Sequence, residues 1–253
     1  MSNILETKKL GIDFGGLTAV NNLSLTIGEK EIVGLIGPNG AGKTTVFNLL
    51  TKVYKPTRGE ILLDSQDTSS FNTEQINRAG VARTFQNIRL FNELSVLDNV
   101  LVGMNNHINY SVFESIFRIG KFHSEERKAV DKAIELLKIL DLDKYADIKA
   151  GSLPYGEQRK LEIARALATE PKLLLLDEPA AGMNPQETEE LMNTIRFVRD
   201  KFKISILLIE HDMNLVMNIC ERIYVLNYGT LLAKGSPDEI KNNPDVIKAY
   251  LGD

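Results

Sequence analysis

The sequence predicts an α/β fold with a mainly parallel sheet and a helical insertion, and three observations support this. Short apolar stretches bounded by turn residues alternate with helical patterns, as they do around parallel sheets. Two of these stretches, 173–176 and 204–209, lack polar alternation, so both of their faces are expected to be covered. Between 86 and 158 no buried-strand run occurs, and apolar residues recur at helical spacing.

The individual elements follow in chain order. Residues 23–27 and 31–36, joined by Gly28-Glu29-Lys30, predict an antiparallel hairpin whose second strand is central and ends at Gly37. Within 86–158, Ser124 is expected to cap a helix, and 105–110 is the most loop-like polar stretch. The remaining expected elements are helices at 44–52 and 157–169, a strand at 60–63, and a closing hairpin of 222–227 and 230–234 around Tyr228-Gly229.

Composition restricts the possible classes of protein. The chain has 253 residues, 43% hydrophobic and 25% charged, which excludes disordered, collagen-like and coiled-coil proteins. The formal net charge of -4 argues against a broad electrostatic contact with nucleic acid or anionic lipid. The longest apolar runs fall far below the roughly 18 residues needed to span a bilayer. With one cysteine and no signal-peptide pattern, the chain is expected in a reducing cytosol, with Cys220 a small buried residue on a helix.

A phosphate-binding pattern is the strongest single feature. Residues 37–44, Gly-Pro-Asn-Gly-Ala-Gly-Lys-Thr, fit G-x-x-x-x-G-K-[ST] between an expected strand and an expected helix. Glycines let the backbone wrap close to phosphate oxygens, and the helix start offers unpaired N–H groups. Lys43 is expected to neutralise phosphate charge, and the Thr44 hydroxyl to bind Mg²⁺. The pattern predicts nucleotide binding without naming the nucleotide.

Two adjacent carboxylates follow the apolar run 173–176. An Asp-Glu pair at a strand end is more often a solvated cap, but downstream of a phosphate-binding loop the functional interpretation is favoured. Neighbouring side chains of a strand point in different directions. Asp177 is therefore expected to hold the Mg²⁺ shell while Glu178 reaches a water aligned on the γ-phosphate.

Longer segments resemble the ATPase subunit of an ABC transporter over almost the whole chain. The residues that carry this likeness are 153–167 (Leu-Pro-Tyr-Gly-Glu-Gln-Arg-Lys-Leu-Glu-Ile-Ala-Arg-Ala-Leu), 173–179 and 180–185. Within the family, the chain is similar to the ATPase of a branched-chain amino acid importer, on residues 14–20, 83–91, 155–165, 178–182, 235–240, 243–247 and 249–252. The resemblance implies a P-loop NTPase (RecA-like) core, an N-terminal antiparallel β subdomain and an inserted α-helical subdomain. The implied boundaries are one domain, 1–253, with a core lobe of 1–85 and 159–253 and a helical subdomain of 86–158.

The resemblance also implies roles for single residues. Gln86 stands where the family has a glutamine that touches Mg²⁺ or the attacking water, its alternative being a surface amide. His211 resembles the histidine whose donor meets the γ-phosphate, its alternative being a polar strand cap. Phe14 lies where an aromatic ring stacks on adenine, its alternative being a core residue. His107 and His123 lack such context and are expected on the surface.

The segment 153–158 stands where the family signature Leu-Ser-Gly-Gly-Gln is found. The helix that it opens is implied to bind the γ-phosphate of ATP held by a second subunit, through Tyr155, Gly156 and Glu157. Pro154 and Tyr155 replace the signature serine and first glycine, which removes a hydroxyl and one backbone N–H. Asn184 stands where many relatives carry an aspartate.

The function implied is ATP hydrolysis with Mg²⁺ by a dimer, homo- or heterodimeric, that drives membrane permease subunits from the inner face of the cell membrane. A periplasmic or lipid-anchored solute-binding protein belongs to such a system without touching this chain. The solute rests on likeness alone, and urea or amide uptake and lipopolysaccharide export stay open. The acidic charge disfavours a soluble ABC clamp on nucleic acid or the ribosome. The lack of an Asn-Lys-x-Asp motif disfavours a GTPase or small-molecule kinase. An inactive subunit is disfavoured because the expected polar residues are all present, namely Lys43, Gln86, Asp177, Glu178 and His211.

The expected site residues are of three kinds. The catalytic residues are Glu178, His211, Gln86 and Lys43; the Mg²⁺ ligands are Thr44, Gln86 and Asp177; and the ATP-binding residues are Phe14, Gly37, Pro38, Asn39, Gly40, Ala41, Gly42, Lys43, Thr44, Thr45, Tyr155, Gly156 and Glu157.

Overall fold

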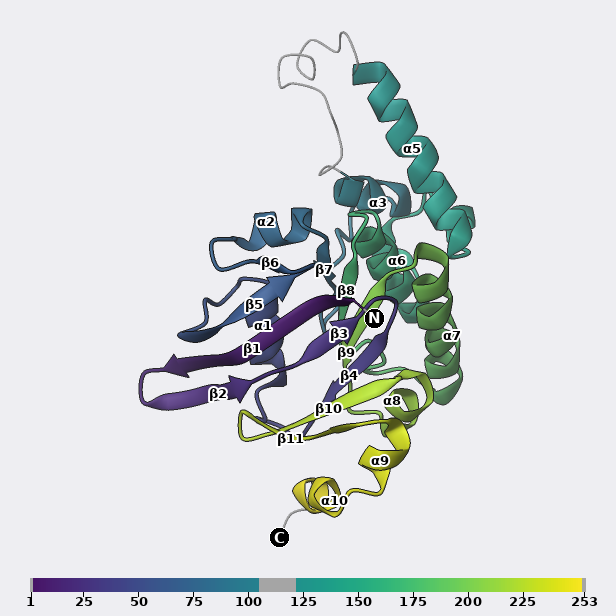
Figure 1. Ribbon diagram of the computed structural model, residues 1–253. Coiled ribbons are helices and arrows are strands. Elements are labelled where there is room, and N and C mark those ends of the chain that lie inside the picture. Colours follow the sequence, from purple (N-terminus) through teal and green to yellow (C-terminus); the bar gives the residue numbers. More distant parts are fainter. Residues whose placement is uncertain (1, 105–121, 252–253) are drawn as a thin grey trace. The chain divides into compact units, whose positions relative to one another are not determined.

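A computed structural model describes residues 2–104 and 122–251 (Figure 1). The chain forms two compact units, one of Met1–Gln86 with Lys172–Asp253 and one of Asn87–Pro171. The second boundary thus falls at Pro171, whereas the sequence suggested 158. Helix α6 (Tyr155–Leu167) groups with the second unit because it packs against α3 (Val96–Met104).

The first unit contains the expected parallel sheet. In the described chain it has six strands in the order β11-β10-β4-β9-β8-β7, and only the β10–β11 pair is antiparallel. Every residue of β4, β8 and β9 is buried, which confirms the prediction of interior strands, and β10 and β11 form the closing hairpin. The strand bounds are β4 (Ile32–Ile36), β7 (Val81–Arg83), β8 (Leu173–Asp177), β9 (Ser205–Ile209), β10 (Arg222–Asn227) and β11 (Thr230–Gly235).

An antiparallel sheet packs beside it in the same unit. Its strands are β1 (Asn3–Phe14), β2 (Leu17–Leu23), β3 (Thr26–Gly28), β5 (Arg58–Leu63) and β6 (Gln66–Asp67). The predicted hairpin of 23–27 and 31–36 is wrong: β3 pairs with β1, whereas β4 lies between β9 and β10 of the other sheet. A strand that is apolar on both faces is buried more completely between two parallel neighbours than in a hairpin.

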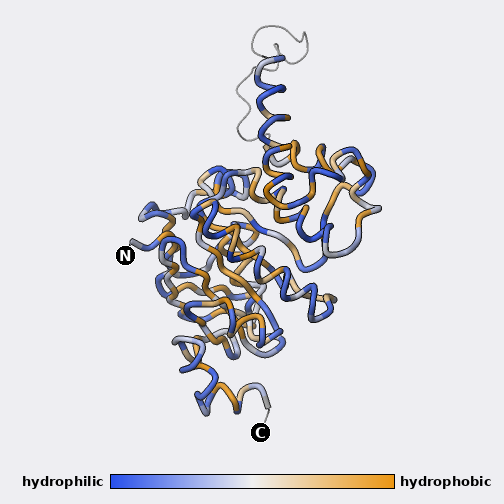
Figure 2. The backbone as a smooth tube through the Cα atoms, turned by 90° about the vertical axis from the view of Figure 1, so that its right-hand side faces the viewer, coloured by the Kyte–Doolittle hydropathy of each residue, from blue (hydrophilic) through white to orange (hydrophobic). Residues whose placement is uncertain are grey.

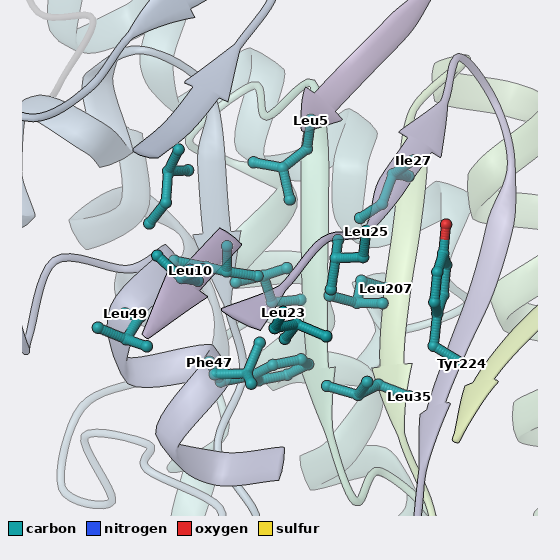
Figure 3. Close-up of a cluster of buried hydrophobic side chains, with 14 of the residues drawn as sticks. Leu5, Leu10, Leu23, Leu25, Ile27, Leu35, Phe47, Leu49, Leu207 and Tyr224 are labelled. Atoms are coloured by element: carbon teal, nitrogen blue, oxygen red, sulfur yellow. The ribbon is translucent and has the colours of Figure 1, made fainter. Parts of the chain in front are cut away.

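Helix α1 (Lys43–Leu50), close to the predicted 44–52, joins the two sheets. Its buried residues Phe47 and Leu49 belong to one hydrophobic cluster with Leu10 and Leu23 of the antiparallel sheet and Leu207 of the parallel sheet (Figure 3). This packing fixes the start of α1 at the carboxyl end of β4. Loops that follow parallel strands at this edge of a sheet commonly build ligand sites.

The opposite face of the parallel sheet is covered by helices. A Cβ atom on Gly34 would lie 3.0 Å from Sγ of Cys220, so β4 and the end of α8 (Met213–Ile219) are in close contact. Cys220 is buried as predicted, although it follows α8 instead of lying on it, and burial raises the pKa of its thiol. The other helices of this unit are α2 (Thr73–Arg78), α7 (Pro185–Phe202), α9 (Pro237–Lys241) and α10 (Pro244–Leu251).

The second unit is helical, as predicted. Its described residues form α3, α5 (Phe122–Ile139), α6 and two short 3₁₀ turns, η2 (Asp143–Tyr145) and η3 (Ala150–Ser152), and they contain no strand. The prediction that Ser124 caps a helix is wrong, because α5 already includes Phe122. The stretch 105–110, including His107, lies outside the described residues, and His123 is exposed.

Burial in the second unit is uneven. The part of α5 next to residue 122 is largely hydrophilic (Figure 2), whereas Ala133 and Leu137 further along are buried. A Cβ atom on Gly103 would lie 2.5 Å from the carbonyl oxygen of Arg165, so the backbones of α3 and α6 approach closely. Across both units, no described helix combines the length and apolar character of a bilayer span.

Candidate functional site

A cavity of about 540 Å³ opens in the first unit at the start of α1. Its volume falls within the usual range of small-molecule sites. The residues that line it are Phe14, Leu17, Thr18, Ala19, Asn39, Gly40, Ala41, Gly42, Lys43, Thr44, Thr45, Glu178, His211, Tyr228 and Gly229. Most of the residues predicted to bind nucleotide therefore share one cavity.

The loop 37–44 depends on glycine for its shape. Gly37 and Gly42 have φ angles of 153° and 101°, which residues with a side chain rarely adopt. A Cβ atom on Gly37 would lie 2.2 Å from the carbonyl oxygen of Leu226, and one on Gly42 would lie 2.8 Å from that of Ala19. Of the predicted loop residues, Gly37 does not line the cavity, and Pro38 lines a separate hollow.

Lys43 brings a buried positive charge to the cavity. The residue Lys43 is 6% exposed, and its Nζ donates to the carbonyl oxygens of Gly37 at 2.7 Å and Pro38 at 3.0 Å. Burial lowers the pKa of Lys43, an effect that the carboxylates of Glu178 and Asp177 oppose. An anion that enters the cavity would therefore meet a poorly solvated ammonium group, whose attraction water screens only weakly.

Two predicted catalytic side chains, Gln86 and His211, contact the carboxylate of a third, Glu178. Nε2 of Gln86 donates to Oε2 of Glu178 at 2.6 Å, and Nε2 of His211 lies 2.9 Å from Oε1 of Glu178. Glu178 itself has a φ angle of +48°, in the left-handed region that non-glycine residues seldom occupy. Such backbone strain is often found at functional sites. Both carboxylate oxygens of Glu178 are thus held in place at the edge of the cavity.

Glu210 is a residue that the sequence reasoning missed. Its Oε1 accepts from the backbone N–H of Ala180 at 2.6 Å, and its Oε2 accepts from that of His211 at 3.0 Å. Burial raises the pKa of Glu210, although these backbone N–H bonds pull it down. The side chain ties the turn after Glu178 to the backbone of His211. The available signal was a carboxylate placed directly after an apolar strand.

Asp177 ends β8 and is held by Arg83, a residue for which the sequence predicted no role. Nη2 of Arg83 contacts Oδ2 of Asp177 at 2.6 Å, and Nη1 of Arg83 donates to Oδ1 of Asn48 at 2.7 Å. Asp177 and the hydroxyl of Thr44, a residue that lines the cavity, are oxygen donors of the kind that hard divalent cations accept. The described residues contain no group of three or more His, Cys, Asp and Glu side chains that could hold a metal ion.

Two exposed aromatic side chains, Phe14 and Tyr228, line the cavity. Phe14 is 43% exposed and makes an edge contact with Tyr54, with ring centroids 5.2 Å apart, so it is not a core residue. Tyr228, which the sequence reasoning did not select, is 87% exposed at a φ angle of +44° in the β10–β11 turn. The accessible ring of Phe14 is compatible with stacking on a planar base.

The remaining predicted residues open α6 in the second unit. Tyr155, Gly156 and Glu157 form its first turn after Pro154, which provides no side-chain cap, and Gly156 faces open space. In the first unit, Asn184 caps α7: its side chain accepts from the N–H of Glu187, and the carboxylate of Glu187 accepts from the N–H of Asn184. Asparagine at this position thus has a clear structural role.

Comparisons with known sequences agree with this geometry. Residues 20–181 match the family model described as "ABC transporter", and residues 230–253 match the model described as "Branched-chain amino acid ATP-binding cassette transporter". The high-affinity branched-chain amino acid transport ATP-binding protein LivG of Salmonella typhimurium is 51% identical over 99% of this chain and 98% of its own. The lipopolysaccharide export system ATP-binding protein LptB of Acidithiobacillus ferridurans is 36% identical over 100% of this chain and 98% of its own.

Solved structures show the same fold. The ADP conformation of MJ1267, an ATP-binding cassette of an ABC transporter, has a TM-score of 0.87 at 31% identity over all of both chains. A dimeric post-hydrolysis state of the ATP-binding cassette MJ0796, bound to ADP and phosphate, has a TM-score of 0.75 at 25% identity over 92% of this chain and 98% of that one. The predicted α/β architecture and the family resemblance are both confirmed.

Proposed function

The chain belongs to the ATP-binding cassette family of ABC transporters, and within it we propose an ATPase that energises the import of branched-chain amino acids. The observation that carries the catalytic part is the fixed carboxylate of Glu178, held by Gln86 and His211 at the edge of a phosphate-binding cavity. The transported solute is inferred from LivG, which is considerably more similar to this chain than LptB is.

Nucleotide binding uses the cavity at the start of α1. The glycine-rich loop and the first turn of α1 offer backbone N–H groups and the positive end of a helix dipole to the phosphates. Lys43 exchanges its carbonyl partners in the loop for β- and γ-phosphate oxygens. The ring of Phe14 stacks on adenine, a contact that favours flat bases without reading their edges.

A magnesium ion would be held by the hydroxyl of Thr44, the carboxylate of Asp177 and the amide oxygen of Gln86. Bound there, the ion would neutralise charge on the phosphate oxygens. In the structure, the amide nitrogen of Gln86 contacts Glu178, and its amide oxygen is the atom that would bind such an ion.

Hydrolysis relies on Glu178 as the general base. The carboxylate polarises a water aligned on the γ-phosphate and accepts its proton, while Lys43 stabilises the charge that develops on the phosphoryl oxygens. His211 orients the carboxylate and donates to the γ-phosphate, and Glu210 holds the backbone from which His211 extends.

The working assembly has at least two kinds of partner. A second ATPase subunit completes the site, because Tyr155, Gly156 and Glu157 at the start of α6 contact the γ-phosphate bound by the other subunit. The helical second unit and the segment after Gln86 receive the membrane permease subunits, which places the chain on the cytoplasmic face of the membrane. The solute-binding protein of such a system makes no contact with this chain, and no nucleic acid takes part.

The test of the catalytic proposal is steady-state phosphate release by the Glu178→Gln variant. We expect kcat to fall by about 100- to 1,000-fold, as is usual when a general base is removed, while ATP affinity stays within about threefold of the parent. Turnover of the variant at the parental rate would show that Glu178 is not the base.

The solute is tested by transport. Cells that lack the chain should lose uptake of radiolabelled leucine and regain it from the parental gene but not from the Glu178→Gln gene. Unchanged leucine uptake, together with lost uptake of urea or short amides, or with defective lipopolysaccharide export, would assign the ATPase to one of those systems instead.

A further inference from the structure

We propose that Arg83 is a positioning residue that holds Asp177 ready for the metal ion of the nucleotide site. The inference rests on the proposed function, because it assumes that Asp177 serves a nucleotide-bound divalent cation. It goes further by assigning a task to a side chain that does not line the cavity. Three features of the structure support it: the contacts of Arg83, their burial, and the elements that they join.

The guanidinium group of Arg83 joins three parts of the site. Nη2 lies 2.6 Å from Oδ2 of Asp177 at the end of β8, and Nη1 donates to Oδ1 of Asn48 in α1 at 2.7 Å. Arg83 itself ends β7, three residues before Gln86. The planar fork of an arginine can hold two acceptors at fixed angles, which a lysine cannot do.

The contact is buried and tightly bounded. The side chains of Arg83 and Asp177 are only 8% and 6% exposed. The guanidinium carbon of Arg83 lies 5.5 Å from the ring centre of Phe47 and 5.0 Å from that of Phe85, within the range of cation–π contacts. A side chain held by two hydrogen-bonded acceptors and two rings has little freedom to turn, so it restricts the orientation of the Asp177 carboxylate.

The geometry leaves one carboxylate oxygen for another partner. Among the described residues, Asp177 is bonded through Oδ2, and no side-chain hydrogen bond involves its Oδ1. β7 and β8 pair in parallel with Arg83 beside Leu175, and the N–H of Thr84 donates to the carbonyl of Leu175 at 2.9 Å. Arg83 therefore fixes Asp177 relative to the backbone that leads to Gln86. Residues that orient a metal ligand in this way typically change metal affinity about 10- to 100-fold when they are lost.

The experiment measures nucleotide affinity with and without metal in the full-length protein. A fluorescent ATP analogue is titrated in excess EDTA and in excess Mg²⁺, and the ratio of the two dissociation constants gives the gain due to the metal. The variants are Arg83→Gln, which removes the charge, and Arg83→Lys, which keeps it without the fork. Circular dichroism melts establish that each variant is folded, and Arg83→Lys carries the test should Arg83→Gln fail to fold.

Arg222 supplies a matched control. Its Nη2 contacts Oε2 of Glu31 at 2.6 Å and its guanidinium lies 5.5 Å from the ring centre of Tyr224, so it too combines an ion pair with an aromatic face. It lies in β10 and does not line the cavity. Arg222→Gln therefore reproduces the loss of a partly buried arginine without touching Asp177.

We expect Arg83→Gln to reduce the gain in affinity due to Mg²⁺ by about tenfold or more, while its affinity in EDTA stays within about twofold of the parent. The gain of Arg83→Lys should lie between those of Arg83→Gln and the parent, and Arg222→Gln should show the parental gain. A parental gain in Arg83→Gln would overturn the inference and leave the proposed function intact. Equal losses with and without metal would also overturn it, because they would reveal general damage to the cavity. A parental protein that gains nothing from Mg²⁺ would overturn the metal part of the proposed function as well.

Discussion

Helices of this protein begin in two different ways. Among the helices whose first residues the structure describes, six begin after a residue whose side chain accepts from N–H groups of the first turn. These helices are α2, α3, α7, α8, α9 and α10, and the capping residues are Asn72, Ser95, Asn184, Asp212, Ser236 and Asn243 respectively. In contrast, α1 follows Gly42 and α6 follows Pro154, and neither of these residues caps its helix with a side chain. The two uncapped starts are the two that the proposed function assigns to phosphate.

The difference separates starts that stabilise the fold from starts that bind a ligand. A side-chain cap satisfies one of the free N–H groups of a first helical turn and is worth about 1 kcal/mol. An uncapped turn forgoes that stability and leaves its N–H groups and the positive dipole end for an external anion. The capped helices should therefore respond to substitution through stability, and the uncapped starts mainly through nucleotide binding.

A large effect is expected from Gly42→Ala at the start of α1. The new Cβ atom would lie 2.8 Å from the carbonyl oxygen of Ala19, at a φ angle of 101°. Relief of this contact must displace the loop, and strain of 1 to 3 kcal/mol corresponds to a loss of up to about 100-fold in affinity for ATP. Titration of a fluorescent ATP analogue measures the change.

The control is Gly16→Ala, a substitution in the β1–β2 turn where a Cβ atom meets nothing within 4 Å. Its ATP affinity should stay within about twofold of the parent, since no backbone shift is required. If Gly42→Ala bound ATP as tightly as Gly16→Ala does, the shape of the loop would not depend on glycine, and the contrast between α1 and the capped helices would lose its basis.

The sequence was informative where a local pattern determines the structure. The loop 37–44, the strand that ends at Asp177 and the closing hairpin all depend on neighbours in the chain, and each was predicted close to its observed bounds. The failed hairpin shows the limit. Gly28 and Ile32 lie only four positions apart, yet they belong to strands of different sheets, because the partners of β4 come from residues more than 150 positions away.

The same limit explains the side chains that were missed. Arg83 lies in a segment that carries the family resemblance, but no role was predicted for it, for Asn48 or for Glu210. The contacts of these side chains join β7 to α1 and β8, and the end of β9 to the turn after Glu178. A single sequence gives no indication of which distant carboxylate an arginine will meet. Grouping of the predicted catalytic residues, in contrast, agrees with the structure, since Glu178, His211 and Gln86 are in contact; their catalytic roles stay predictions.

Lys43→Met tests the idea that the start of α1 gives up stability for binding. Burial lowers the pKa of Lys43 below 10.5, so its charged form is less favourable in the folded protein than in the unfolded chain. We expect the variant to lose ATP binding and to have a higher free energy of unfolding and a higher Tm than the parent. Thermal melts and nucleotide titration measure the two effects.

The sign of its pH dependence follows from the lowered pKa. The cost of burying charged Lys43 is full at neutral pH and disappears as pH rises from the folded pKa to 10.5, so the advantage of Lys43→Met should shrink over that window. Lys52→Met is the control, because burial also lowers the pKa of Lys52, a residue outside the cavity. It should stabilise the protein without weakening ATP binding. A destabilised Lys43→Met protein would contradict the argument.

The smallest expected effect concerns a capped start. In Asn184→Ala, the N–H of Glu187 loses the oxygen that it contacts at 3.0 Å, which should lower the free energy of unfolding by about 1 kcal/mol and leave ATP affinity unchanged. Asn184→Asp keeps an acceptor at that position and adds a negative charge at the positive end of α7, so its stability should equal or exceed that of the parent. Chemical denaturation with parallel ATP titrations distinguishes the two variants. Equal stability of the two variants would mean that the side-chain cap contributes nothing. A loss of ATP affinity in Asn184→Ala would mean that capped helix starts also serve the nucleotide, and capping would then no longer separate the two kinds of helix.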